Sequence, residues 1–288
     1  MTSETDLSPS WRGLVDDAAV FPPGSAELGS ALSAYVERTG PARDLVASFV
    51  ITDQDLPAVV EHVDPARVRA SVVVTGGAGA IAGACRLAAK GTTLHALEIA
   101  LRDLDDLTGN AHRVVAAVED ARAEGLLGED VPVFVELPQA ETTSDWLHAA
   151  DEVAAAELRL KFRTGGVEAH LFPTAYQLAS WIDAALDREL PFKCTAGLHH
   201  AIAHRDHDTG FAHHGFLNLL VATEALFDGS DTHEAQRLLG LDRADTLLAE
   251  IGDARLDRAR RWFTSFGSCS VNDPLDDLTR LGLLEDAQ

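Results

Sequence analysis

Short apolar runs alternate along the chain with longer amphipathic segments. Eight runs rich in Val, Ile, Leu and Phe have the length of buried strands, at residues 13–20, 45–51, 68–74, 94–100, 131–137, 158–163, 191–195 and 263–268. Between them, apolar residues at helical spacing predict helices over residues 26–37, 55–62, 78–89, 111–124, 144–154, 174–189, 215–225, 232–239, 244–251 and 275–281. This alternation predicts an α/β fold with a parallel sheet, and eight units predict a (β/α)8 TIM barrel. An open, doubly wound sheet is the structural alternative, although the first strand-to-helix turn lacks a Gly-x-Gly-x-x-Gly fingerprint.

The spacing of the elements also predicts the domain organisation. We expect one barrel domain over residues 1–288, with residues 1–9 as a flexible N-terminus that has no apolar signal-peptide core. Residues 198–262 form a far longer connection than the others and hold more than one predicted helix. Such an extended loop or helical insertion after the seventh strand is typical of a lid, a site wall or an oligomer contact.

Composition excludes several classes of partner. Asp and Glu number 46 against 23 Lys and Arg, a formal net charge of −23, which argues against nucleic-acid binding because phosphates would be repelled. No run of eighteen apolar residues is present, so we expect no membrane span. Three cysteines without a Cys-x-x-Cys pair suit a reducing cytoplasm. A small-molecule substrate is expected, and a homo-oligomer is compatible with the sequence.

Two lysines occupy consecutive predicted strands, and they are the strongest chemical signal in the chain. Alternation along the strands places Lys161, Arg163 and Lys193 on the lumen side, near the carboxyl ends where barrel enzymes build their sites. A buried lysine is unfavourable unless it is paired or used. A neighbouring cation lowers a lysine's pKa, and a neutral amine can attack a carbonyl.

Cations crowded into one lumen require carboxylates nearby. Glu98 on the fourth strand and Glu136 on the fifth are candidates, as are Asp16 and Asp17 at the end of the first. Lysines and carboxylates around a cavity have pKa values shifted in opposite directions, which acid–base chemistry requires. The alternative is that these groups form structural ion pairs inside the barrel and catalyse nothing.

Small-residue turns follow the last three strands. In barrels such turns often bind phosphate through backbone N–H groups, and here they would form a cradle together with Arg163. The turn residues concerned are Gly165, Gly166, Gly197, Gly267 and Ser268. Three ordinary tight turns are the alternative interpretation.

Three of these segments carry a resemblance: Lys161-Phe-Arg-Thr-Gly165, Lys193-Cys-Thr-Ala-Gly197 and Phe266-Gly-Ser-Cys-Ser270. They resemble the class I, Schiff-base aldolases of the deoxyribose-phosphate aldolase type. That resemblance implies an aldolase or lyase acting on a small polar or phosphorylated carbonyl compound. It implies that Lys161 forms the imine, that Lys193 lowers the pKa of Lys161, and that Glu98 stands where the family has an acidic residue. Arg163 departs from the family's small residue at its position, and the turn after the seventh strand is unusually rich in histidine.

Six histidines lie between residues 199 and 214. His199 and His200 directly follow the seventh strand, where an imidazole could act as a general acid or base. His200 and His204 are four residues apart, so on a helix they would share a face and, with His199, could chelate a divalent metal. The Schiff-base hypothesis requires no cofactor. A metal-dependent hydrolase or isomerase is therefore one alternative function, and a non-catalytic ligand-binding barrel is another.

Overall fold

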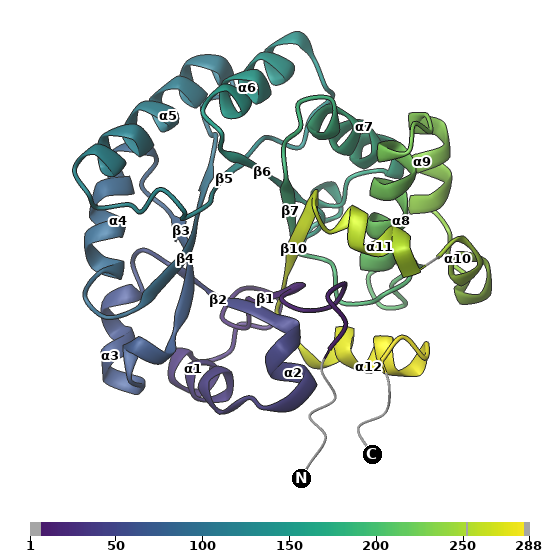
Figure 1. The fold of residues 1–288 in the computed structure, drawn as a ribbon, viewed down its shortest axis with the longest axis horizontal. Coiled ribbons are helices and arrows are strands. Elements are labelled where there is room, and N and C mark those ends of the chain that lie inside the picture. Colours follow the sequence, from purple (N-terminus) through teal and green to yellow (C-terminus); the bar gives the residue numbers. More distant parts are fainter. Residues whose placement is uncertain (1–6, 252, 285–288) are drawn as a thin grey trace.

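A closed ring of parallel strands forms the centre of the molecule (Figure 1). The computed structural model describes residues 7–251 and 253–284. The ring runs in the order β1, β10, β7, β6, β5, β4, β3 and β2, and the (β/α)8 TIM barrel predicted from the sequence is confirmed. Its strands are β1 (Val15–Asp17), β2 (Val46–Thr52), β3 (Arg69–Val74), β4 (Thr93–Ala100), β5 (Val133–Glu136), β6 (Arg159–Arg163), β7 (Phe192–Thr195) and β10 (Phe263–Ser268). Each of the eight predicted strands has its counterpart.

Helices cover the outside of the ring (Figure 1). They are α1 (Leu28–Glu37), α2 (Gly40–Leu45), α3 (Val59–His62), α4 (Ile81–Ala88), α5 (Leu107–Ala123), α6 (Ser144–Ala155), α7 (Ala175–Leu186) and α12 (Asn272–Arg280). The short helix α2 was not predicted. Helix α5 begins four residues before its predicted start, because the Asp106 carboxylate accepts a hydrogen bond from the Gly109 N–H and caps the helix there.

The connection from β7 to β10 contains the predicted helical insertion. It comprises a two-stranded hairpin, β8 (His204–Arg205) with β9 (Ala212–His213), followed by α8 (Phe216–Phe227), α9 (Thr232–Leu239), α10 (Ala244–Glu250) and α11 (Asp253–Ala259). The hairpin and α11 were not predicted. Helix α8 is buried on nearly all sides, because it packs against β10, α7, α9 and α11. The insertion is therefore part of the core.

Aromatic packing outside β6 decides which of its side chains face the lumen. Phe162 stacks on Trp146 of α6 at 6.4 Å between ring centroids, and it contacts Trp181 of α7 and Phe192 of β7. Because side chains alternate along a strand, Lys161 must then point to the opposite face. Burial of these rings in the helix layer therefore fixes Lys161 in the lumen.

The expected flexible N-terminus falls mainly outside the described residues. Within its described part, Leu7 is buried against the core, and the Ser8 carbonyl accepts hydrogen bonds from the backbone of Trp11 and Arg12. None of the described helices combines the length and the apolar character needed to cross a membrane.

Candidate active site

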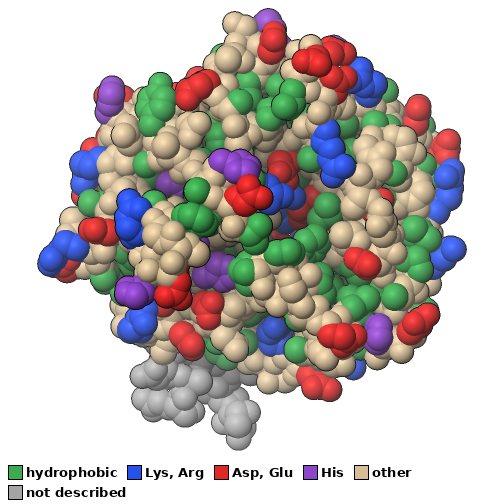
Figure 2. Space-filling view, turned by 180° about the vertical axis from the view of Figure 1, so that it is seen from behind, with side chains coloured by type: hydrophobic (Ala, Val, Ile, Leu, Met, Phe, Trp, Pro, Cys, Tyr) green, Lys and Arg blue, Asp and Glu red, His purple; other side chains and the backbone are tan. Residues whose placement is uncertain are grey.

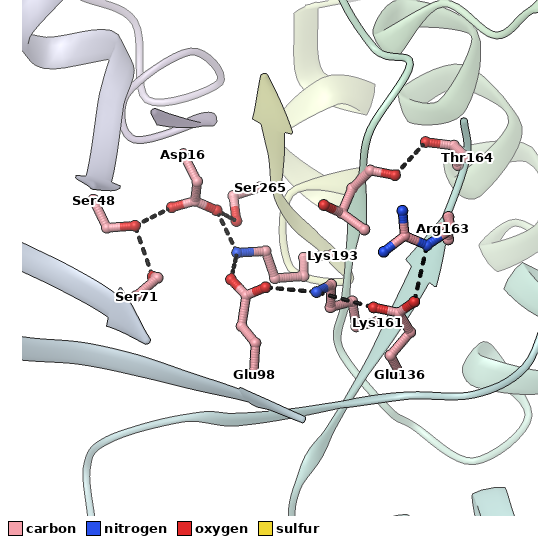
Figure 3. A network of polar contacts seen from close by, with 11 residues as sticks. Asp16, Ser48, Ser71, Glu98, Glu136, Lys161, Arg163, Thr164, Lys193 and Ser265 are labelled. Atoms are coloured by element: carbon pink, nitrogen blue, oxygen red, sulfur yellow. Dashed lines mark hydrogen bonds and ion pairs between the residues drawn. The ribbon is translucent and has the colours of Figure 1, made fainter. Parts of the chain in front are cut away.

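Charged side chains of alternating sign run through the barrel lumen (Figure 3). In order they are Asp16, Lys193, Glu98, Lys161, Glu136 and Arg163. Lys193 Nζ lies 2.6 Å from Asp16 Oδ2 and 2.6 Å from Glu98 Oε1. Lys161 Nζ lies 2.8 Å from Glu98 Oε2 and 3.0 Å from Glu136 Oε2. We call this row the charge ladder.

The strand register explains why three residues of the ladder lie in one row. Glu136, Lys161, Lys193 and Ser265 are paired partners across β5, β6, β7 and β10. Residues in one such row point to the same side of the sheet, and in a closed barrel that side is the lumen. Of the two acidic residues that end β1, Asp16 joins the ladder, whereas Asp17 pairs with Arg38 on the helix side at 2.8 Å.

Burial makes the ladder electrostatically strong. Burial raises the pKa of Glu98, but Lys161 and Lys193 outweigh it and bring that pKa down to about 2. For Lys161, burial acts to lower the pKa, yet Glu136 and Glu98 outweigh burial and the pKa lies above its usual value. The expectation that Lys193 depresses the pKa of Lys161 is thus only partly met. Lys193 does act in that direction, but two carboxylates act against it more strongly, and Lys161 holds its proton.

A cavity of about 400 Å³ opens at the carboxyl ends of the strands; we call it the upper cavity. Lys161, Glu98, Glu136, Arg163 and His199 all line it. Of the turn residues expected in a phosphate cradle, Gly166, Gly197 and Gly267 line it as well. On the face in Figure 2, a central hollow contains basic beside acidic side chains, with histidines near it, which agrees with this lining.

Two residues expected in the cradle have other contacts. Gly165 packs against Gly197 so closely that a Cβ on Gly165 would lie 2.7 Å from the Gly197 Cα. Ser268 is buried, and its hydroxyl donates to the Ser270 carbonyl at 2.6 Å. The structure therefore places neither in the lining of the upper cavity, and the cradle is reduced to the remaining three glycines and Arg163.

Lys193 also departs from its expected place. Its side chain lines a different cavity at the amino ends of the strands, where Nζ lies 5.2 Å from the centre of the Phe134 ring. The two amines are neighbours joined by Glu98, but of the two only Lys161 lines the upper cavity. The reason is that Asp16, on the amino-end side of the ladder, draws the Lys193 ammonium toward itself.

His199 forms a second polar group at the edge of the upper cavity. Its Nε2 lies 3.5 Å from Cys269 Sγ, and its Nδ1 lies 3.4 Å from Asp273 Oδ2. Burial lowers the pKa of His199, with Asp273 opposing, and burial raises the pKa of the Cys269 thiol. At neutral pH the arrangement is a neutral imidazole between a thiol and a carboxylate, which can accept or return a proton.

The predicted histidine metal site does not form. His200 lies in a loop, 3.2 Å from Asp277, and His204 lies on β8, so the two share no helix face although their rings are 4.9 Å apart. Within the described parts of the chain, no three His, Cys, Asp or Glu side chains come together as a metal site. In the described residues, His199, His200 and His204 are therefore not arranged as a metal site.

One signal in the sequence was missed. The chain has only three lysines, Lys90, Lys161 and Lys193, so 20 of its 23 Lys and Arg residues are arginines. Two of the three lysines lie in the ladder, while Lys90 is exposed. Most of the positively charged residues in this chain are arginines. Lysine at the two lumen positions therefore indicates that an amine, and not a guanidinium, is needed there.

The fold and the ladder together define a (β/α)8 barrel whose lumen carries paired amines and carboxylates. No protein-family model matches the chain, and no curated protein matches it in sequence. Among solved structures it is similar to one described as the unique tetrameric structure of deoxyribose phosphate aldolase from Aeropyrum pernix. The TM-score is 0.56 with 11% identity, covering 95% of this chain and 93% of that chain. At this identity the likeness shows the fold alone.

Proposed function

We propose that the protein is a barrel enzyme that forms a Schiff base between Lys161 and a small carbonyl compound, in an aldolase or lyase type of reaction. The observation that carries the proposal is the position of Lys161, whose amine lines the upper cavity between two carboxylates. The fold shared with a deoxyribose phosphate aldolase supports the same chemistry by analogy.

The choice of lysine supports a chemical role over a purely structural one. An arginine could form the same ion pairs and would hold its charge permanently, whereas a lysine amine can lose its proton and become a nucleophile. The complete pairing of Lys161 favours the second candidate, a barrel in which the ladder only stabilises the fold and a bound ligand is not transformed.

Substrate binding would release the proton from Lys161. Arg163 is 36% exposed and donates from Nε to Glu136 Oε1 at 3.1 Å. An anionic group of the substrate that pairs with Arg163 would weaken the hold of that cation on Glu136. The pKa of Glu136, which Lys161 and Arg163 hold below its usual value, would then rise, and this carboxylate, 3.0 Å away, would become a better acceptor for the Lys161 proton.

The bond changes then follow from the neutral amine. Its nitrogen attacks the carbonyl carbon, one proton passes from that nitrogen to the carbonyl oxygen, and a neutral carbinolamine forms. Glu136 returns the proton it took from Lys161 to the hydroxyl of the carbinolamine, which leaves as water and gives a protonated imine. In a substrate with a hydroxyl on its β carbon, Glu136 takes the hydroxyl proton and the bond between the α and β carbons breaks. The β carbon leaves as an aldehyde, the electron pair passes to the imine nitrogen to give an enamine, and Glu98 stays ionised throughout.

Borohydride trapping tests the proposal directly. The protein is incubated with phosphorylated and unphosphorylated small aldehydes and ketones, reduced, and analysed by intact mass and peptide mapping. With only three lysines, an adduct can be assigned without ambiguity, and the exposed Lys90 reports nonspecific modification. We expect a reduced adduct on Lys161 and none on Lys90.

A charge-preserving variant separates the two candidates. Lys161→Arg keeps the cation in the ladder but cannot form an imine, whereas Lys90→Arg makes the same change at an exposed position. We expect trapping to be lost in Lys161→Arg and retained in Lys90→Arg, with both variants folded by circular dichroism. Wild-type protein that gives no adduct on Lys161 with any compound would leave the ligand-binding barrel as the better account.

A further inference from the structure

A second cavity, of about 440 Å³, lies at the amino ends of the barrel strands; we call it the lower cavity. Its volume is within the range of about 300–1,000 Å³ typical of small-molecule sites. The amino-terminal face of a TIM barrel ordinarily serves stability, and active sites form at the opposite face. The function proposed for the upper cavity therefore does not account for it.

The lower cavity is strongly basic in a strongly acidic protein. Its cationic lining residues are Arg12, Arg43, Arg69, Arg159 and Lys193, against the carboxylates Asp16 and Asp44. Acidic residues outnumber basic ones by 46 to 23 over the chain, so the balance here is reversed. These residues come from separate segments, among them α2 and the first residues of β3 and β6, and only the closed barrel brings them together.

Three of these arginines lack the carboxylates that would explain them as structural ion pairs. Within the described residues, Arg43, Arg69 and Arg159 form no ion pair. Arg159 is half-buried with its guanidinium 5.7 Å from the centre of the Phe134 ring, and burial lowers its pKa. Arg43 and Arg69 are exposed, whereas the half-buried Arg159 loses hydration without gaining a counter-charge, and an anion supplied by a ligand would relieve that cost.

One neighbouring side chain, His95, adds a donor for the same anion. Arg69 Nη2 donates to His95 Nδ1 at 2.9 Å, so the neutral His95 imidazole carries its proton on Nε2 and remains a donor. Ser265 and Ser71 also line the cavity, and Ser265 donates to Asp16 at 2.6 Å. The Asp16 carboxylate is therefore paired with Ser265 and Lys193, and these contacts partly neutralise its repulsion of an incoming anion.

We propose that the lower cavity is a binding site for a small phosphate-bearing anion, separate from the upper cavity. Guanidinium groups match phosphate oxygens with two parallel N–H donors each, and the site supplies several of them around one space. The volume exceeds what a single phosphate needs, so a ligand with two phosphoryl groups is the best fit. Pyrophosphate is the probe of choice, because it carries both groups without a further moiety.

Isothermal titration of the full-length protein with pyrophosphate tests the proposal. We expect saturable binding with one site per chain. Arg69→Gln and Arg159→Gln should each weaken it about tenfold, since each removes a charge-assisted contact. Arg243→Gln is the matched control, because Arg243 is 72% exposed and pairs only with Asp245 in the described structure. That variant should bind pyrophosphate like the wild type. Arg163→Gln removes an anion contact of the upper cavity and should leave the site that depends on Arg69 and Arg159 intact.

A second measurement uses the unaltered protein and does not depend on how the variants fold. Phenylglyoxal modifies accessible arginines, and peptides cut at acidic residues report each site by mass. Pyrophosphate should protect Arg69 and Arg159 and leave Arg243 reactive. The proposal is overturned if wild-type protein shows neither saturable binding nor protection. It is also overturned if Arg163→Gln abolishes binding while Arg69→Gln and Arg159→Gln retain it, because the anion would then occupy the upper cavity.

Discussion

Replacing Glu98 by Gln tests the electrostatic core of the site. Glu98 is 1% exposed and is the single carboxylate that bridges both lysines of the ladder. Glutamine keeps the volume of the side chain but removes its charge. Its amide oxygen can accept from one ammonium, while its NH₂ group would then face the other. The variant therefore leaves one buried cation poorly paired.

The magnitude follows from the pKa of Glu98, which falls from 4.5 to about 2 in the folded protein. A shift of that size corresponds to about 3 kcal/mol of folding free energy near neutral pH. Desolvation of the badly paired lysine adds to the loss, so we expect Glu98→Gln to lower the free energy of unfolding by about 3–5 kcal/mol.

The pH dependence gives a sharper signature than the loss itself. A carboxylate with a depressed pKa stabilises the protein above its unfolded pKa, and this contribution is lost as the pH falls toward the folded value. The contribution of Glu98 should decline from about 3 kcal/mol near pH 6 to about half of that near pH 3. Wild type and Glu98→Gln should therefore converge in stability as the pH is lowered.

Urea unfolding followed by circular dichroism across this pH range is the assay. Glu124→Gln is the control, because Glu124 is 57% exposed and its pair with Arg86 lies on the surface. We expect the control to change stability by less than about 1 kcal/mol. A similar small change in Glu98→Gln, or a difference from wild type that does not shrink at low pH, would refute the reasoning about the ladder.

Three further predictions concern other contacts. Lys193→Met should reduce the free energy of unfolding by about 3–5 kcal/mol, because it leaves Asp16 and Glu98 without their shared ammonium; equal urea midpoints for variant and wild type would contradict this. Asn218→Ala should destabilise the protein by about 2–4 kcal/mol in the same assay. The buried Asn218 amide on α8 bonds the Ala203 N–H, just before β8, and the carbonyls of Leu238 and Leu241 at the end of α9. A loss near zero would show that these bonds contribute little. Cys269 should be alkylated by iodoacetamide before the other two cysteines, which are buried. Because burial raises the pKa of this thiol, its alkylation rate should keep increasing with pH beyond the usual thiol pKa. A rate that is already constant at neutral pH would count against the raised pKa.

The strand pattern was readable because each strand is buried on its outer face. Side chains such as Leu160 and Phe162 leave a plain apolar signal, and the lysine between them must then face inward. Elements without such a face escaped prediction. Helix α2 has six residues and one buried side chain, and the β8–β9 hairpin has two residues in each strand. Both are too short to show a hydrophobic periodicity in the sequence.

The site, like the fold, could be predicted only in part from the sequence. The alternation of side chains along the strands was enough to place Lys161 and Lys193 in one lumen, and the need for counter-charges indicated Glu98 and Glu136 as their neighbours. This alternation could not predict which cavity each amine lines, since that depends on where the nearest carboxylates lie in three dimensions. Asp16 draws Lys193 toward the amino ends, and Glu136 holds Lys161 toward the carboxyl ends.

The sequence by itself therefore determined the barrel, its long insertion and the inward-facing charges, because hydrophobic periodicity acts locally along each strand. Only the tertiary structure decided that a row of alternating charges keeps both amines protonated, and that arginines from distant segments surround a second cavity. Coulombic interactions depend on distances across the closed barrel, and residues far apart in the chain become neighbours only when the ring of strands closes.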